Sequence, residues 1–256
     1  LKMTSKGGSS HIASVFSIAD IIAVLYENIL LFDSKNPKMV NRDRFILSKG
    51  HAGAGVYAVL AEKKFFSTDE LSNHYQNGSN LSGHISHKNI PGVEISTGSL
   101  GHGLPISVGI ALAAKLNKQN HKVFVLISDG ECDEGSNWEA SLFAAHHELD
   151  NLTVIIDRNN LQSIKSTEET LKIEPLKDKW NSFGWHVDEV DGHNITALNH
   201  VLSKDYCIPK KPKCVIAKTI KGKGVSFMEN NNLWHYRSPQ DKEFTDALNE
   251  LESLNL

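Results

Sequence analysis

Residues 122–130, KVFVLISDG, and residues 152–160, LTVIIDRNN, are the part of the sequence that decides the fold. Each begins with a run of β-branched and other apolar residues, which predicts strands over Lys122–Ser128 and Leu152–Asp157. The segment between them predicts a helix over Asn137–Leu149. A strand, a helix and a strand in this order are typical of two parallel strands that lie side by side in one sheet.

The remainder of the chain shows the same alternation of short apolar runs and helical patterns. Further strands are predicted at Arg44–Leu47, near His186–Val190 and at Lys213–Thr219. Helices are predicted at Ser17–Leu30, from the Gly-rich Lys49–Gly55 to about Lys64, near Ser67–Tyr75, at Leu104–Lys118, over Ile195–Asp205 and, as a short segment, at the end of the chain. The pattern predicts one α/β domain over residues 1–256, in which helices flank both faces of a parallel sheet.

Two irregular segments interrupt this alternation. Asn77–Gly103 is rich in Gly, Ser and His, and loops of such length without regular structure are usually functional. The Gly-rich loop Lys221–Gly224 opens a second irregular stretch that runs to Pro239. The first segment is therefore a candidate for carrying binding residues.

Composition excludes several functional classes. The 256 residues are 40% hydrophobic and 22% charged. With 27 basic and 30 acidic residues the net charge is −3, so no basic surface for nucleic acid or membranes is expected.

Three cysteines without a CxxC pair favour a reducing compartment, and we expect the protein to be cytoplasmic. No apolar run approaches the roughly 20 residues that span a bilayer, and no signal peptide is expected. Because Leu1 is not an initiator Met, we expect some upstream residues to be missing.

Polar residues follow the two strands of the deciding stretch. Asp129-Gly130 comes directly after the first strand, and Asn159 follows the second. Ligands of open α/β sheets bind outside the carboxyl ends of the strands, where these residues would meet. Either piece alone is typical of an ordinary turn or loop. Their combination, thirty residues apart and after adjacent strands, favours a site for an anion and a metal ion.

The donor types favour magnesium bound to a diphosphate. Mg²⁺ takes six oxygens at about 2.0–2.1 Å and is usually held by few protein groups together with phosphates. The Asp129 carboxylate, the Asn159 amide oxygen and the Leu161 backbone carbonyl, with two diphosphate oxygens and a water, would complete that number. Ca²⁺ or Mn²⁺ could take the place of Mg²⁺. Gly130 would let backbone N–H groups approach the anion closely.

The same residues carry a family resemblance. Ser128-Asp129-Gly130 followed by Asn159 resembles the Gly-Asp-Gly and Asn motif of thiamine-diphosphate enzymes, with Ser128 in place of the first Gly. Other stretches resemble transketolases in particular, and these are Asn41–His51, Thr97–Gly103, Lys218–Gly224, Ser10-His11 followed by Ala19-Asp20-Ile21, and Gly83-His84 ten residues before Glu94. The usual Gly-His-Pro-Gly is here Ser10-His11-Ile12-Ala13. The resemblance implies a thiamine-diphosphate-binding fold and covers essentially the whole chain.

The resemblance also implies roles for individual residues. The cofactor contacts that it implies are His51, Gly98, Ser99, Leu100, Asp129, Gly130, Glu131, Glu134, Asn159 and Leu161, and the metal ligands are Asp129, Asn159 and Leu161. The catalytic residues that it implies are His11, His51, His84 and His235. Tyr236 follows His235 where a Gly is usual. Glu134 corresponds to a glutamate at the subunit interface, although an acidic residue at a helix N-terminus would also be favoured there by the helix dipole. Trp138 and Trp185 are expected in the core.

Transketolases have two further domains, which this chain does not match. The pyrimidine-binding domain supplies the glutamate that activates the cofactor, so the resemblance implies a partner subunit that carries this domain. We expect an α2β2 heterotetramer that transfers a two-carbon ketol unit from a ketose, or a ketose phosphate, to an aldose acceptor. The donor and acceptor sugars are not identified by the sequence.

Three rival classes differ from this hypothesis in testable ways. A deoxyxylulose-phosphate-synthase-like enzyme or the α chain of a keto-acid dehydrogenase would share the cofactor, but Asn41–His51 and Lys218–Gly224 favour transketolase. A nucleotide-binding oxidoreductase would need GxGxxG after a strand, and none is present. A binding module that has lost catalysis would not be expected to keep Asp129, Asn159 and four motif histidines.

Overall fold

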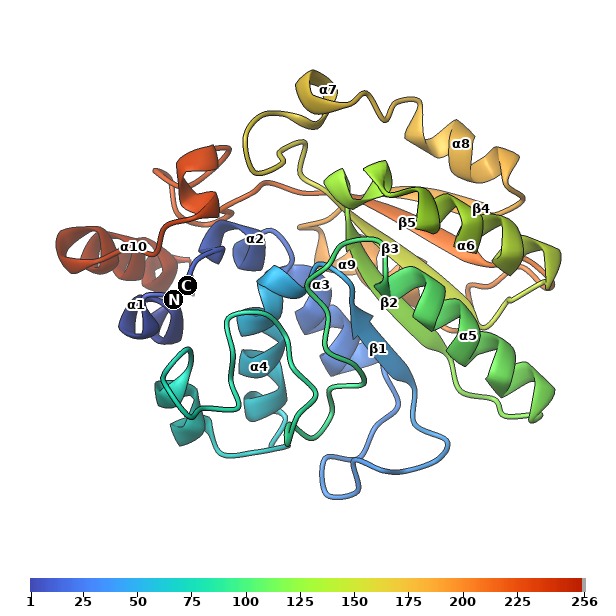
Figure 1. The fold of residues 1–256 in the computed structure, drawn as a ribbon, viewed down its shortest axis with the longest axis horizontal. Coiled ribbons are helices and arrows are strands. Elements are labelled where there is room, and N and C mark those ends of the chain that lie inside the picture. Colours follow the sequence, from blue (N-terminus) through green and yellow to red (C-terminus); the bar gives the residue numbers. More distant parts are fainter. Residues whose placement is uncertain (255–256) are drawn as a thin grey trace.

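A parallel sheet of five strands forms the centre of the protein in the computed structural model, which describes residues 1–254 (Figure 1). Its strands are β1 (Arg44–Leu47), β2 (Val123–Ser128), β3 (Leu152–Arg158), β4 (His186–Asp191) and β5 (Lys213–Lys218). They lie in the order β1-β2-β3-β5-β4, and every neighbouring pair is parallel. The predicted fold class, a parallel sheet flanked by helices, is confirmed.

The central strands are apolar along most of their length because both of their faces are covered. In β2, Phe124 and Leu126 point into one hydrophobic cluster, whereas Val123, Val125 and Ile127 point into another. All six residues of β2 are buried. The two clusters form the two halves of the core, one on each side of the sheet.

Helices from both halves of the sequence cover the first face. Buried residues of the following helices belong to the cluster that contains Phe124, namely α2 (Ile12–Phe16), α3 (Ala19–Val24), α4 (Gly53–Glu62), α9 (Ile195–Leu202) and α10 (Asp241–Ser253). The second face is covered by α5 (Gly103–Leu116), α6 (Gly135–His146) and α8 (Leu176–Ser182). Figure 1 shows α5 and α6 side by side along the sheet. Trp185 is buried in the second cluster and Trp138 packs against it, as predicted.

The shorter elements lie mainly at the ends of strands and in connections. They are α1 (Lys2–Gly7), α7 (Thr167–Thr170), a π-helical turn (Leu25–Ile29) and 3-10 turns at Gly50–Ala52, Thr68–Asn73, Gly130–Asp133 and Asn232–His235. Residues 77–102, all of which the structure describes, contain no helix or strand. The long irregular segment predicted there is therefore confirmed.

Two helix predictions need correction. The single helix predicted at Ser17–Leu30 is α3 followed by the π-helical turn, and Ser17 itself ends α2. Ser17 keeps helical backbone angles, whereas Ile18, with φ −108° and ψ 3°, departs from them and separates α2 from α3. Helix α8 was not predicted, because only Leu176 and Trp180 face the core in an otherwise polar segment. The terminal helix α10 has 13 residues and is not short.

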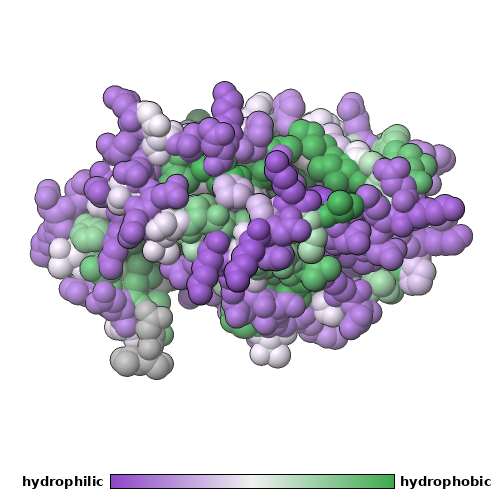
Figure 2. All heavy atoms as spheres, turned by 90° about the horizontal axis from the view of Figure 1, so that it is seen from below, coloured by the Kyte–Doolittle hydropathy of each residue, from purple (hydrophilic) through white to green (hydrophobic). Residues whose placement is uncertain are grey.

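The surface is dominated by polar side chains. Figure 2 shows one face on which hydrophilic residues predominate and apolar residues gather in separate patches. Across residues 1–254, the longest apolar stretch in any helix falls short of what would cross a membrane.

Candidate active site

A cavity of about 220 Å³ opens at the carboxyl edge of the sheet. Its wall includes residues that directly follow β2 and β3, which is where ligands of open α/β sheets bind. Most of the predicted site residues line it, namely His11, His51, His84, Gly98, Leu100, Asp129, Gly130, Asn159, Leu161 and His235. These residues come from segments throughout the chain, and only the fold brings them together.

Three predicted cofactor contacts lie outside this wall. Ser99 and Glu134 are exposed, and Glu134 packs beside Gly101, where an added Cβ would lie 2.7 Å from the Glu134 Cβ. The Glu131 side chain is completely buried and accepts hydrogen bonds from the Gly101 N–H at 2.8 Å, the Ser128 N–H at 3.2 Å and the Ser48 hydroxyl. Burial raises the pKa of Glu131 although these donors oppose the shift. Its carboxylate therefore joins Ser48, Gly101 and Ser128 and does not line the cavity.

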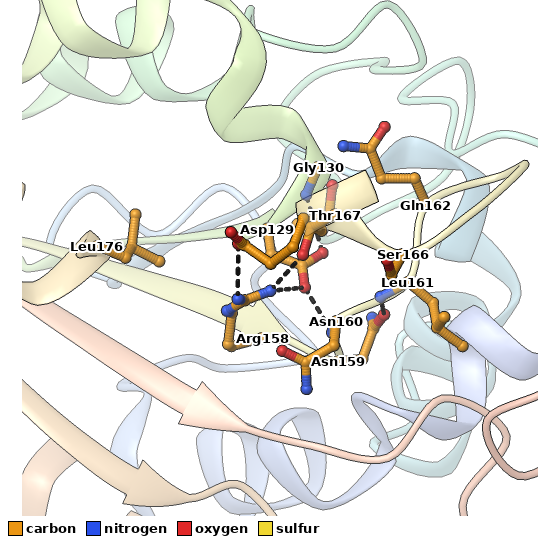
Figure 3. Close-up of polar contacts among 12 residues, drawn as sticks. Asp129, Gly130, Arg158, Asn159, Asn160, Leu161, Gln162, Ser166, Thr167 and Leu176 are labelled. Carbon is orange, nitrogen blue, oxygen red and sulfur yellow. Dashed lines mark hydrogen bonds and ion pairs between the residues drawn. The ribbon is translucent and has the colours of Figure 1, made fainter. Parts of the chain in front are cut away.

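Asp129 is the one predicted metal ligand with a carboxylate, and it is almost completely buried. One oxygen accepts from the Gly130 N–H at 2.8 Å, and the other accepts from the Asn160 N–H at 2.7 Å and from Arg158 Nη1 at 3.2 Å (Figure 3). Burial and the nearby Asp157 raise its pKa to about 6, against the effect of Arg158 and the two N–H donors. A cation would relieve the cost of this buried charge.

The other two predicted metal ligands lie on the loop after β3. Asn159 Oδ1 accepts from the Leu161 N–H at 3.1 Å, and the Leu161 carbonyl accepts from Lys221 Nζ at 3.3 Å. Carboxylate, amide and carbonyl oxygens are the donors that Mg²⁺ prefers. At Gly130, which lines the cavity, an added Cβ would lie 2.8 Å from Gln162 Cγ, so a larger residue would have to displace the Gln162 side chain. The residues therefore fit a cation with a diphosphate.

Two buried lysines beside this site were missing from the predicted set. Lys49 forms an ion pair with Asp157, and both side chains are buried. Lys221 Nζ lies 3.1 Å from the Gln162 carbonyl and 2.9 Å from His235 Nδ1, and burial together with Lys49 lowers its pKa to about 8. Both lysines line the cavity, where positive charge suits a diphosphate. Their positions within Asn41–His51 and Lys218–Gly224 were the available signal.

Four histidines from distant segments meet on one side of the cavity. The ring centroid of His11 lies 5.1 Å from that of His51, 5.5 Å from that of His84 and 5.0 Å from that of His235. Burial, followed by nearby cationic groups, lowers the pKa of His11 to about 4 and that of His235 to about 3. The pKa of His51 is lowered well below its ordinary value for the same reasons. These three rings are neutral near pH 7 and can hydrogen-bond hydroxyl groups without a fixed charge.

Tyr236 completes the wall on the side of His235. Its ring centroid lies 4.7 Å from that of His235 and 5.7 Å from that of His11. The side chain is exposed and lines the cavity, so a phenol stands where the family resemblance leads one to expect glycine. The departure at this position does not displace His235 from the cavity.

Stability is expected to fall on acidification because several buried or half-buried histidines are held in the neutral form. His74, which lies 2.9 Å from the Ser9 hydroxyl through Nε2, joins His11 and His235 in this group, and burial lowers its pKa to about 4. The folded pKa values lie below the unfolded value of 6.5, so this contribution to stability is complete above pH 6.5 and is lost as pH falls towards 4. The limiting slope is about 1.4 kcal/mol per pH unit for each such histidine.

Urea unfolding between pH 7.5 and pH 5 would measure this slope. We expect the free energy of unfolding to decrease with pH and the slope to be smaller in His74→Asn, whereas His147→Asn, on the exposed end of α6, should match the parent protein. A flat profile between pH 6.5 and pH 5 would contradict the prediction.

The fold and the cavity define an α/β domain of the kind that binds a phosphorylated cofactor at the carboxyl edge of its sheet. Residues 1–251 match the family model described as the transketolase, thiamine diphosphate binding domain. The chain therefore belongs to the transketolase family.

Curated relatives of similar length support this assignment. One of them, a subunit of the apulose-4-phosphate transketolase of Phocaeicola vulgatus, is 39% identical over 98% of this chain and 89% of that protein. The 6-deoxy-6-sulfo-D-fructose transketolase subunit SqwG of a Clostridium species is 37% identical over 98% of this chain and 92% of that protein. The chain is thus a thiamine-diphosphate-dependent enzyme subunit of transketolase type. The synthase-like and dehydrogenase alternatives are not favoured.

Solved structures show the same fold within longer proteins. Transketolase from Campylobacter jejuni superimposes with a TM-score of 0.91 at 32% identity, and transketolase from Leishmania mexicana with a TM-score of 0.91 at 31% identity. The match covers 98% of this chain but 40% and 39% of those chains, respectively. This chain therefore corresponds to less than half of each solved transketolase.

Proposed function

We propose that this chain is the diphosphate-binding subunit of a two-subunit transketolase that moves a two-carbon ketol unit from a ketose or ketose phosphate to an aldose. The observation that carries the proposal is the cavity itself. It unites the oxygen donors of Asp129, Asn159 and Leu161 with four histidines, of which His11, His51 and His235 are held neutral. The oxygen donors suit a phosphorylated cofactor with its cation, and the histidines suit a polyhydroxylated substrate.

The part of the cavity that carries the oxygen donors would hold the diphosphate and its cation. Asp129, Asn159 and Leu161 would bind Mg²⁺, or Ca²⁺ or Mn²⁺ in its place, through their oxygens. The Gly130 N–H would approach the diphosphate, and Lys221 would balance its charge. Gly98 and Leu100 line the wall on the loop that precedes α5 and would contact the remainder of the cofactor. When bound, thiamine diphosphate supplies the electron sink that ketol transfer requires.

The part of the cavity that carries the four histidines would bind the sugar. Neutral imidazoles can donate or accept a hydrogen bond, so His11, His51 and His235 can orient hydroxyl groups and exchange protons with them. His84 lies at the exposed side of the cluster, where it would contact the incoming substrate. None of these four side chains carries a carboxylate. This part of the cavity therefore favours hydroxyl and phosphate groups over cationic substrates.

We propose that residues 1–256 form a single domain whose partner subunit supplies the pyrimidine-binding domain. Relatives of similar length that are named as transketolase subunits imply a second kind of chain in those enzymes. The surface also has exposed apolar side chains that a partner could cover, among them Ile106 on α5 and Leu142 and Phe143 on α6. An α2β2 heterotetramer in the cytoplasm would cover such groups and complete each site.

Reconstitution with the partner subunit tests the proposed function. We expect neither chain alone to transfer ketol units, and the mixture to do so in the presence of Mg²⁺ and thiamine diphosphate. Calorimetry should detect uptake of thiamine diphosphate by the mixture, and chelation of Mg²⁺ should abolish it. A correctly folded mixture that takes up no thiamine diphosphate with Mg²⁺ present would overturn the proposal.

A further inference from the structure

We propose that Asp157 is a positioning residue that orients the amide of Asn159, and thereby sets the affinity of the cavity for its divalent cation. The inference rests on the proposed function, because it concerns how the cation site is built. Asp157 itself is completely buried and is absent from the cavity wall. It would act on the cation through Asn159 and not by binding it.

Asp157 joins four segments of the chain at the carboxyl end of β3. Its Oδ2 accepts from the Ser17 hydroxyl at 2.7 Å, from Asn159 Nδ2 at 2.9 Å and from Lys49 Nζ. Its Oδ1 accepts from the Thr219 hydroxyl. Four donors to one buried carboxylate leave the side chain a single orientation.

The bond to Asn159 decides which way its amide faces. An amide has one acceptor oxygen and one donor nitrogen, and their assignment follows from their partners. Because Asn159 Nδ2 donates to Asp157, Oδ1 lies on the side of the Leu161 N–H, at 3.1 Å. A flipped amide would place Oδ1 against the carboxylate of Asp157, where two acceptors repel. Asp157 therefore keeps the amide oxygen available to a cation.

Lys49 makes this arrangement possible by neutralising a buried charge. Burial acts to raise the pKa of Asp157, but the ion pair with Lys49 and the hydroxyl donors outweigh it and leave the pKa below its ordinary value. Lys49 Nζ also donates to the Ser14 carbonyl at 3.2 Å, so its orientation is fixed as well. Removing one member of such a pair leaves an uncompensated charge, whereas removing both does not.

The test uses Asp157→Leu, which removes the acceptor of the Asn159 amide, together with Lys49→Met and the double variant, in the enzyme reconstituted with its partner. Mn²⁺ replaces Mg²⁺, and electron paramagnetic resonance measures bound and free Mn²⁺ in the presence of thiamine diphosphate. The parent enzyme must first show Mn²⁺-dependent cofactor binding, and failure at that stage would count against the proposed function. If the parent binds, the variants test only the role of Asp157.

We expect Asp157→Leu to weaken Mn²⁺ binding about 10–100-fold, as loss of a partner that orients a metal ligand typically does. Saturating Mn²⁺ should restore most of kcat, because the ligands themselves remain. The double variant removes both members of the ion pair and serves if Asp157→Leu does not fold. Because Lys49 lines the cavity, its reference is Lys49→Met alone, and the double variant should bind Mn²⁺ more weakly than that single variant. Ser17→Ala removes another donor from the same carboxylate oxygen and should change the affinity less than about 3-fold, well below the loss expected for an orienting partner.

Two results would overturn the inference. The first is parent-like Mn²⁺ affinity in a folded Asp157→Leu variant, or a double variant that binds Mn²⁺ as tightly as Lys49→Met alone. The second is an equal loss of affinity in Ser17→Ala, since that substitution leaves the bond between Asp157 and Asn159 in place. Circular dichroism and thermal melting of each variant separate these results from misfolding.

Discussion

Asp129→Ala is expected to abolish Mg²⁺-dependent binding of thiamine diphosphate to the reconstituted enzyme. Asp129 carries the one carboxylate among the proposed ligands, so its loss removes both a donor and the negative charge that attracts the cation. It also leaves Arg158, whose Nη1 lies 3.2 Å from Asp129, as a positive group facing the cation. Together these effects should weaken cofactor binding at least about 100-fold, more than loss of a partner that only orients a ligand. Calorimetric titration with thiamine diphosphate in Mg²⁺ measures the change.

The loss should report on binding and not on folding. Burial already disfavours the charged form of Asp129 and raises its pKa to about 6, so its removal relieves that cost. Arg158 keeps its bonds to Glu174 at 2.9 Å and to the Thr167 hydroxyl at 2.7 Å, and is not left without partners. The Gly130 and Asn160 N–H groups lose their acceptor, so thermal melting of the variant is measured beside its binding. Glu139→Gln, on the exposed side of α6, is a matched control and should bind normally. Undiminished Mg²⁺-dependent binding in Asp129→Ala would refute the metal site.

The sequence predicts the sheet well because its central strands are buried on both faces. Uninterrupted apolar runs such as Val123–Ser128 have few alternative structures, and the turn after each run marks the strand end. Helix α8 escaped prediction because its core contact depends on Leu176 and Trp180 alone. Such tertiary contacts have no local signature.

The same distinction applies to the site. Histidines such as His11 and His84 could be selected because each lies in a stretch that resembles a family motif, and the structure places them together. The ion pair between Lys49 and Asp157 joins residues 108 positions apart, so no spacing rule indicates it. Glu131 resembles a cofactor contact in sequence because it adjoins Gly130, yet the 3-10 turn at Gly130–Asp133 directs its carboxylate into the interior. A local pattern identifies which segments form the site, whereas packing decides which side chains face the ligand.

Gly50→Ala is expected to destabilise the protein strongly, because two backbone segments meet at this residue. An added Cβ would lie 2.2 Å from the Thr97 carbonyl oxygen and 2.4 Å from its carbon. The Gly50 carbonyl also accepts from the Ile85 N–H at 2.9 Å, so Gly50 supports the long segment that carries His84 and Gly98 from both sides. Backbone cannot rotate away as a side chain can. We expect a loss of about 2–4 kcal/mol in the free energy of unfolding, at or above the usual cost of overpacking.

Gly109→Ala provides a control of opposite sign. Gly109 lies within α5, on an exposed face, and no atom lies within 4 Å of an added Cβ. Alanine is favoured over glycine inside a helix by about 0.5–1 kcal/mol, so this substitution should stabilise the chain. Urea unfolding of both variants measures the two effects under the same conditions. If Gly50→Ala is as stable as Gly109→Ala, the segment 77–103 is not held against Gly50, and the positions of His84 and Gly98 would need another explanation.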